Sequence, residues 1–430
     1  MPDSSPINSE NPAVDSPRRP SLLEAIGPGI LVAATGVGAG DLAGGAIAGS
    51  KLKLAVLWAV LIGAGLKYVC CEGLTRWQLQ TKTSLPDGVF QATHRSVRFG
   101  FLIYVAVWSF CIGGMLMSAV GECAQAILPI GSSSTGRLVH GCLHSIAAIL
   151  LVRIGGFKLF ERMMAACIAV MFVTVIAVAV MSAPDWGGVA AGLVIPRVPD
   201  ADGEGIDWTL TLMAGVGGTL TMLCYGNWIR EKNRVDASSL SACQIDLAAG
   251  YIMTALFGIG MVILGSRLPV EPGVKGVNLI TNLADDMADH LGRFGTAAGW
   301  MFRIGAWGAV FSSLLGVWQS VPSLIQDMLP TKPVQKEGRL YQRLLISMGT
   351  VPMICLPFSL AAVQKVAGVT GASFLPMFAL ALLLLPFTQK ARQSGFRNGV
   401  FSTLVLALSL LLFSFLAVQK VLAQFAPPPT

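Results

Sequence analysis

One acidic residue, Asp41, lies in the middle of a long apolar stretch. No other ionisable residue occurs between Glu24 and Lys51. The segment 27–49 is long enough to cross a bilayer, for which roughly 20 apolar residues suffice. A carboxylate at the centre of a membrane helix costs about 2.5–3.5 kcal/mol on insertion scales, and such residues mark ion or substrate sites. The sequence therefore predicts that Asp41 belongs to an ion or substrate site inside the membrane.

Glycines surround Asp41 and weaken the helix around it: Gly36, Gly38, Gly40, Gly44 and Gly45. Each glycine costs a helix interior about 1 kcal/mol relative to alanine. We expect the helix to come apart here and to expose backbone carbonyls beside the acid. The four-residue spacing of Gly36, Gly40 and Gly44 is also typical of close helix packing. Packing alone is a second explanation of these glycines, but it does not explain the acid among them.

The composition is that of a helical membrane protein. Of the 430 residues, 54% are hydrophobic and only 12% are charged, whereas soluble domains are about 25% charged. Strand-like alternation is absent, so we predict an all-α bundle within the lipid bilayer rather than a barrel. About eleven spans are expected, at 27–49, 54–74, 101–127, 138–152, 158–182, 208–229, 243–266, 296–328, 340–362, 366–388 and 399–422.

The charges alternate from loop to loop along these predicted spans. Basic residues gather in every second loop, for example Arg76, Lys82, Arg95 and Arg98, while the intervening long loops are acidic. This positive-inside pattern predicts a plasma (inner) membrane protein with a cytoplasmic N-terminus and an external C-terminus. It also makes a nucleic-acid partner unnecessary, and no obligate protein partner is evident. Residues 1–22 are polar and rich in proline and serine, which predicts a disordered cytoplasmic tail.

The sixth predicted span, 208–229, also carries glycines in its middle, at Gly215, Gly217 and Gly218. Glycine-interrupted helices at matching places in two halves of a chain point to a transporter built from inverted repeats, with its site at the membrane midplane. The repeats would cover about 27–182 and 208–388, with an extra helix at 399–422. All three lie in one transmembrane domain, 23–425.

Several short motifs follow one another along residues 22–390. They are Gly27-Pro28-Gly29, Asp41-Leu42-Ala43-Gly44, Glu72-Gly73-Leu74-Thr75-Arg76, Glu122-Cys123-Ala124-Gln125, Gly156-Phe157-Lys158, Gly217-Gly218-Thr219-Leu220-Thr221-Met222 and Phe311-Ser312-Ser313. In order and spacing they resemble the Nramp family of divalent-metal transporters, and some features resemble its magnesium-transporting relatives. The resemblance implies a LeuT-like 5+5 inverted repeat with helices 1 and 6 broken at mid-membrane. It also implies a divalent metal ion as substrate and no further cofactor.

The resemblance also implies a ligand set. Asp41 keeps the aspartate of the family's DPGN motif, and Gly44 stands where that motif has asparagine. Backbone carbonyls near Gly38 and at Gly218 remain available. Thr221 falls at the position of the family's methionine ligand, and Met222 follows it.

Two registers of the sixth span stay open and predict different ions. With Thr221 facing the ion, the site offers only oxygen, which suits Mg²⁺, Ca²⁺ or Mn²⁺. A roomy oxygen site is typical of hydrated Mg²⁺. With Met222 facing the ion, a soft sulfur ligand favours Mn²⁺ or Fe²⁺ instead.

Other charged residues lie within the spans. Glu122 resembles the third-span acid that aids proton transfer in the family, and Gln125 occupies the next acidic position, so both mark a proton or gating path. Because the sixth span has no histidine and the amide of Gln125 cannot titrate, proton coupling is not expected. Passive entry driven by the membrane voltage is physically possible. Lys67, Glu72 and Arg303 are interpreted as charges that pair, or reach water, near helix ends.

The sequence therefore predicts divalent-cation transport by alternating access, with magnesium or manganese as the ion. One alternative is a sodium-coupled amino-acid carrier of the same superfamily, although Asp41 would repel a substrate carboxylate. A non-transporting membrane protein or a membrane enzyme is the other alternative. Hydrolase motifs such as HExxH and GxSxG are absent, so an enzyme is not expected.

Overall fold

The computed structural model describes residues 27–425 except 183, 201–203, 268–276, 291, 330–337 and 359. The predicted N-terminal tail, 1–22, lies outside these residues. The described chain is helical and contains no strand, as the composition predicts. Its α-helices are α2 (Pro28–Gly36), α3 (Ala39–Leu52), α4 (Leu57–Thr81), α5 (Leu85–Ala92), α6 (Arg95–Ile127), α7 (Ser133–Met181), α8 (Trp186–Val194), α9 (Gly205–Gly215), α10 (Tyr225–Glu231), α11 (Leu240–Gly265), α12 (Val277–His290), α13 (Gly295–Met328), α14 (Arg339–Thr350), α15 (Leu360–Leu384), α16 (Gln389–Ser394) and α17 (Val400–Phe425). Short 3₁₀ helices are η1 (Lys53–Val56), η2 (Leu220–Cys224), η3 (Ala237–Ser239), η4 (Gly292–Phe294), η5 (Val351–Cys355) and η6 (Leu385–Phe387).

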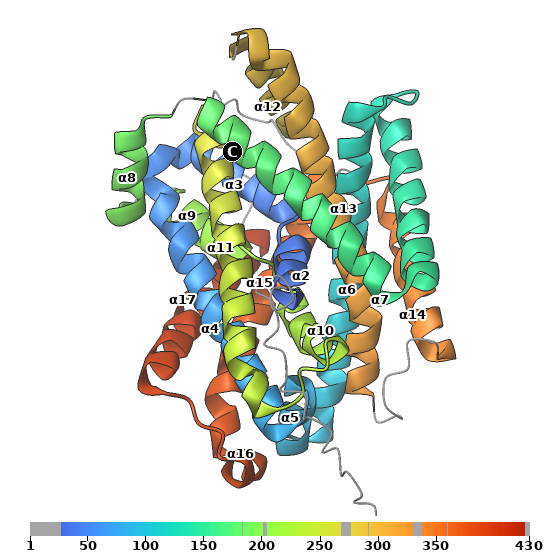
Figure 1. Cartoon of the computed structure of the whole chain (residues 1–430), viewed down its shortest axis with the longest axis vertical. Coiled ribbons are helices and arrows are strands. Elements are labelled where there is room, and N and C mark those ends of the chain that lie inside the picture. The colour runs from blue at the N-terminus through green and yellow to red at the C-terminus, as the bar shows by residue number, and fades with distance from the viewer. Residues whose placement is uncertain are drawn as a thin grey trace, which may run out of the picture.

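Eight helical stretches of the described residues are long and apolar enough to cross a membrane. This number is smaller than the eleven predicted spans because helices merge or fall short of the required length. The predicted spans 138–152 and 158–182 both belong to α7, which bends sharply at Gly156 (Figure 1). Gly156 has φ +60° and ψ −175°, a conformation open essentially to glycine alone. Helix α14 is only 12 residues long.

The first and sixth predicted spans are both broken, as the glycine pattern predicts. Helix α2 ends at Gly36 and α3 begins at Ala39. Helix α9 ends at Gly215, and η2 leads into α10 only from Leu220 onward. Figure 1 shows α2 and α10 near the middle of the bundle, α3 above them and α9 to their left, with α11 in front.

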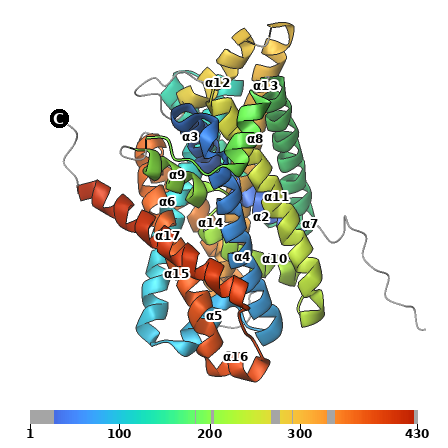
Figure 2. The same ribbon diagram turned by 90° about the vertical axis from the view of Figure 1, so that its left-hand side faces the viewer.

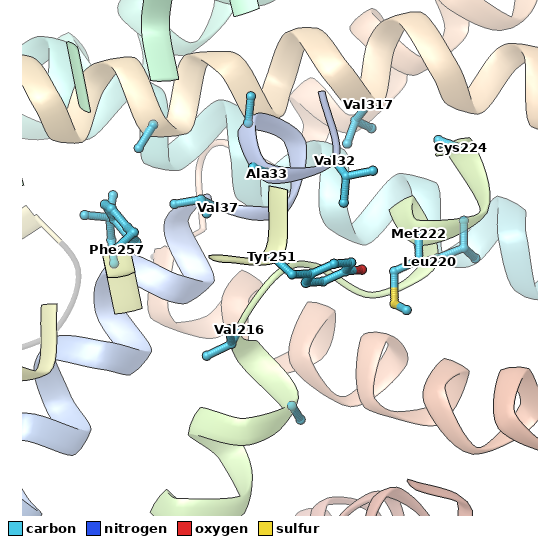
Figure 3. Packing of buried hydrophobic residues seen from close by; sticks show 14 of the residues in the cluster. Val32, Ala33, Val37, Val216, Leu220, Met222, Cys224, Tyr251, Phe257 and Val317 are labelled. Carbon is cyan, nitrogen blue, oxygen red and sulfur yellow. The ribbon is translucent and has the colours of Figure 1, made fainter. Parts of the chain in front are cut away.

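Close backbone contacts hold the broken helices in place. A Cβ atom at Gly29 would lie 2.0 Å from the carbonyl oxygen of Asp246, and one at Gly49 would lie 2.2 Å from that of Val262. Only glycine therefore allows α2 and α3 to pack this tightly on α11. Apolar side chains of the same core, including Val37, Val216 and Met222, fill the space around the breaks (Figure 3).

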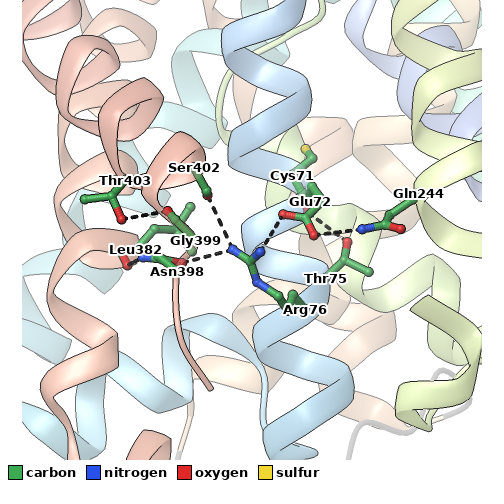
Figure 4. A network of polar contacts seen from close by, with 10 residues as sticks. All are labelled: Cys71, Glu72, Thr75, Arg76, Gln244, Leu382, Asn398, Gly399, Ser402 and Thr403. Atoms are coloured by element: carbon green, nitrogen blue, oxygen red, sulfur yellow. Dashed lines mark hydrogen bonds and ion pairs between the residues drawn. The ribbon is translucent and has the colours of Figure 1, made fainter. Parts of the chain in front are cut away.

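The last helix, α17, runs across α15 and α4 on the outside of the bundle (Figure 2). Arg76 of α4 connects them, because its guanidinium donates to Asn398 Oδ1 at 3.0 Å and lies 3.4 Å from Glu72 (Figure 4). Gln244 of α11 donates in turn to Glu72 at 3.1 Å. Glu72 is therefore paired, as interpreted from the sequence, although it lies nine residues before the end of α4.

Candidate functional site

The two helix breaks meet at the carboxylate of Asp41. One carboxylate oxygen accepts the N–H of Gly38 at 3.3 Å, and the other accepts the N–H of Gly217 at 3.2 Å. These N–H groups have no helical partner because the helices are interrupted. Asp41 is 8% exposed, so a single buried carboxylate links the unwound segments of both repeats.

The carbonyl groups at the first break are satisfied by two hydroxyls. Ser312 of α13 donates to the carbonyl of Ala34 at 2.9 Å, and Ser313 donates to that of Val37 at 3.1 Å. The end of α2 is thus closed by neutral side chains of a neighbouring helix.

The carbonyl groups at the second break are satisfied by a cation. The ammonium group of Lys67, on α4, donates to the carbonyl of Ala214 at 2.6 Å and to that of Gly218 at 2.5 Å. The Lys67 side chain has no exposed surface. The interpretation that Lys67 pairs or reaches water near a helix end was wrong, because this residue caps the C-terminus of α9 inside the protein.

A cavity of about 440 Å³ lies against Asp41. It extends along α3 and α9 as far as Ile47 and Trp208, and residues of α6, α11, α13 and α15 also line it. No residue of α10 lines it. The cavity therefore extends from the breaks toward the end of the bundle where Ile47 and Trp208 lie, and away from α10.

Five of the predicted site residues line this cavity together: Asp41, Gly38, Gly44, Gly218 and Thr221. Met222 does not line it and is fully buried in the apolar core (Figure 3). The hydroxyl of Thr221 lies next to the backbone of Gly218, since a Cβ atom at Gly218 would be 2.5 Å from it. The polar groups that Asp41, Gly218 and Thr221 provide at the cavity floor are therefore oxygen atoms that could coordinate a cation.

The glycines of α3 divide into two sets. A Cβ atom at Gly40 or Gly44 would meet nothing within 4 Å, whereas one at Gly45 would lie 2.8 Å from Met261. Packing explains Gly45 and Gly49. It does not explain Gly40 and Gly44, which leave the cavity wide beside Asp41.

Glu122 and Gln125 lie apart from the cavity, and neither lines it. Glu122 is buried and lies 3.5 Å from the guanidinium of Arg137. Gln125 accepts the N–H of Ile130 at 2.9 Å and holds the loop after α6. A role for this pair in a proton or gating path remains a prediction.

The side of the bundle around α10 is closed by charged and aromatic groups. Arg230 pairs with Asp327, and Lys232 pairs with Glu161 at 2.6 Å. The indole of Trp228, which is fully buried, donates to Gln319 at 2.9 Å. These contacts join α10 to α13 and α7 and separate the cavity from that side.

A second set of contacts lies at the far ends of α3 and α9. Glu204 pairs with Lys51 and accepts the indole N–H of Trp208 at 3.0 Å, while the Lys51 ammonium lies 5.3 Å from the centre of the Trp208 ring. The hydrogen bonds from Lys51 and Trp208 lower the pKa of Glu204 below its usual 4.5. The two half-helices beside the cavity are tied to each other at its mouth.

In the described part of the chain, no group of three or more His, Cys, Asp and Glu side chains could hold a metal ion. A site here depends on one carboxylate and on neutral oxygens. Such a donor set fits a hard ion that keeps some of its water and is released again, rather than a resident metal.

The described residues adopt a LeuT-like helical fold. Solved structures share this fold: the manganese transporter of Eremococcus coleocola, with a TM-score of 0.76 at 17% identity, covers 99% of this chain and 93% of its own. MhsT, solved with L-phenylalanine, has a TM-score of 0.58 at 16% identity and covers 92% and 97%.

Sequence comparison defines the family. The Nramp family model (natural resistance-associated macrophage protein-like) matches residues 29–423. The divalent metal cation transporter MntH of Chromohalobacter salexigens is 24% identical over 383 residues, which is 80% of this chain and 83% of that protein. The chain belongs to the Nramp family. Members of this family are integral membrane transporters and not enzymes, and its divalent metal transporters support metal cation transport here.

Proposed function

We propose that this protein carries a divalent cation, Mg²⁺ or Mn²⁺, across the membrane by alternating access, with Asp41 as its charged ligand. The observation that carries the proposal is the position of the Asp41 carboxylate, which joins both helix breaks at the floor of the cavity. MntH of Chromohalobacter salexigens and the Eremococcus coleocola protein, which are named for divalent metal and manganese, support this ion class.

The contrast between the two sides of the bundle supports alternating access. The cavity reaches Asp41 along α3 and α9, while the ion pairs around α10 close the opposite side. Rocking of the half-helices would open one side as it closes the other. With the N-terminus in the cytoplasm, the cavity would face outward and the ion would enter the cell.

The test is uptake into proteoliposomes that contain a pH-sensitive dye. Mg²⁺, Ca²⁺, Mn²⁺ and Cd²⁺ compete in the assay, and Asp41→Asn, which is nearly isosteric, is the matched variant. We expect wild-type uptake of Mg²⁺ or Mn²⁺ without acidification of the lumen, and no uptake by Asp41→Asn. Uptake by Asp41→Asn at the wild-type rate would remove Asp41 from the site, and acidification driven by the metal would show proton coupling.

The choice between the two ions depends on Thr221. Because this residue lines the cavity and Met222 does not, the proposed site is an oxygen site with room for a partly hydrated ion. Thr221→Met would add a soft sulfur ligand and should shift competition toward Cd²⁺ and Mn²⁺. Unchanged competition would mean that position 221 does not face the ion.

A further inference from the structure

Lys67 is a fully buried cation whose ammonium donates two hydrogen bonds to the wall of the cavity. The acceptors are the carbonyls of Ala214 and Gly218, and both of these residues line the cavity. Lys67 itself does not line it. The ammonium therefore lies directly behind the surface that an incoming ion would meet.

The two buried charges bracket a single dipeptide. Asp41 accepts the N–H of Gly217, and Lys67 donates to the carbonyl of Gly218. The unwound segment is thus held between an anion and a cation, and the pair has no net charge.

A neutral amide or hydroxyl would satisfy the same carbonyls at a lower desolvation cost, as Ser312 and Ser313 do at the first break. Capping of α9 therefore does not by itself account for a charged side chain at this position. The carbonyl of Gly218 is one of the oxygens proposed to bind the transported metal, and the ammonium takes the place that a cation would take on it.

We infer that Lys67 is a tethered resident cation: its ammonium occupies the Gly218 carbonyl and balances Asp41 in the empty carrier, and the transported metal has to displace it. This inference rests on the proposed function. It identifies a residue that sets both the affinity for the metal and the return of the empty carrier.

Geometry makes the competition direct. A metal ion sits about 2.0–2.6 Å from each oxygen ligand, and the Lys67 nitrogen is 2.5 Å from the Gly218 oxygen. A divalent ion on the same oxygen would lie within about 5 Å of the ammonium, where like charges repel strongly in a protein interior. Binding of the metal therefore requires the ammonium to withdraw from Gly218.

The resident cation also has a kinetic consequence. Without metal, the carrier must reorient with Asp41 buried, and an unbalanced carboxylate would oppose that step. Lys67 supplies the balancing charge in the empty state only. Removal of the charge should slow net uptake, which includes the empty return step, more than metal–metal exchange, which does not.

The experiment compares Lys67→Met with Lys67→Gln. Methionine removes the charge and the hydrogen bonds, whereas glutamine removes the charge but keeps an N–H donor for the carbonyls. Binding of Mn²⁺ is measured by calorimetry on purified protein, and folding is checked by size-exclusion chromatography. Net uptake and exchange of radioactive Mn²⁺ are then measured in proteoliposomes.

We expect both variants to bind Mn²⁺ about tenfold more tightly than wild type, since each lacks the competing charge. We also expect net uptake to fall several-fold relative to exchange. Mn²⁺ binding by Lys67→Gln that is unchanged or weaker than that of wild type would overturn the inference. So would weaker Mn²⁺ binding by Lys67→Met together with wild-type binding by Lys67→Gln. In either case Lys67 would act as a helix cap alone. Failure of the wild type to bind or transport any divalent ion would instead refute the proposed function.

Discussion

The break between α2 and α3 and the break between α9 and α10 leave the same kind of backbone groups without helical partners. At the first break, the hydroxyls of Ser312 and Ser313 satisfy the carbonyls; at the second, the ammonium of Lys67 does. One carboxylate, Asp41, serves N–H groups of both. The carbonyl groups of the first break are therefore bound by neutral donors, and those of the second break by a charged one.

The backbones of the two breaks also differ. Val37 and Gly38 are extended, with φ of −81° and −133°, and such values are open to any residue. Gly217 and Gly218 have φ of +81° and +78°, which side-chain-bearing residues rarely adopt. The backbone conformation of the second break requires glycine at its own positions. The first break does not, and depends more on the helices packed around it.

The largest expected effect is that of Gly218→Ala. Alanine would be strained at φ +78°, and its Cβ would lie 2.5 Å from the Thr221 hydroxyl and 3.0 Å from the Cα of Gly36. We expect a loss of about 3 kcal/mol or more of stability, from backbone strain and overpacking together. Thermal unfolding in detergent would measure it.

Gly40→Ala is the matched control for Gly218→Ala. Its Cβ meets nothing within 4 Å, and Gly40 lies in α3. Here alanine should leave the stability unchanged or raise it by up to about 1 kcal/mol. Equal losses of stability in both variants would show that the backbone conformation at position 218 does not require glycine any more than that at position 40.

The sequence predicts this contrast in part. The glycines of both spans and Asp41 between them identify the breaks, because glycine in a helix and an acid in an apolar span are local signals. The partners of the breaks are not local. Lys67 lies 147 residues before Ala214 in the chain, and Ser312 lies 278 residues after Ala34, so only the packing of α4 and α13 against the half-helices reveals what they bind.

A smaller effect is expected at the neutral cap of the first break. Ser313→Ala removes the hydroxyl that donates to the carbonyl of Val37, and Ser312→Ala removes the one that donates to Ala34. The single hydroxyl hydrogen of Ser313 cannot serve both carbonyls, although Ala34 lies 3.3 Å from it. An orphaned buried acceptor costs about 1–3 kcal/mol, so each substitution should lower the stability by about this amount in thermal unfolding. Neither change alters the charge of the site, and metal selectivity in competition assays should stay that of the wild type. A change of selectivity would contradict the division between a neutral and a charged break.

The half-helix that follows the first break has room for one more ligand. Gly44 lines the cavity and has open space around it, so an asparagine fits there and would place an amide oxygen near Asp41. We expect Gly44→Asn to bind Mn²⁺ about tenfold more tightly in calorimetry, which is about 1.4 kcal/mol. Gly44→Ala fills the same space without an oxygen and should bind as the wild type does. Equal gains in both variants would attribute the effect to helix stability rather than to a ligand.

The wrong interpretation of Lys67 has a physical cause. A lysine within an apolar span usually extends its charged end to the membrane surface, and its distance along the chain from the helix end does not show which way it points. The direction of the Lys67 side chain follows from the close contact between α4 and α9, because Gly63 of α4 leaves no room for a side chain against Met213. The structure places Thr221 in the cavity wall and Met222 in the apolar core, whereas the sequence alone leaves both positions open.

The smallest effect is expected where the far ends of α3 and α9 meet, because Glu204 is largely exposed there and surface ion pairs contribute less than about 1 kcal/mol. The pKa of Glu204 is lowered by Lys51 and Trp208. The ionised form is therefore favoured in the folded protein, and its contribution is present above the usual value of 4.5 and lost as the pH falls through the lowered pKa. Glu204→Gln should lower the melting temperature slightly at about pH 6, and this difference should vanish in high salt and at about pH 3. If the difference in melting temperature persisted in high salt and at about pH 3, packing of Trp208 rather than the ion pair would join α3 to α9.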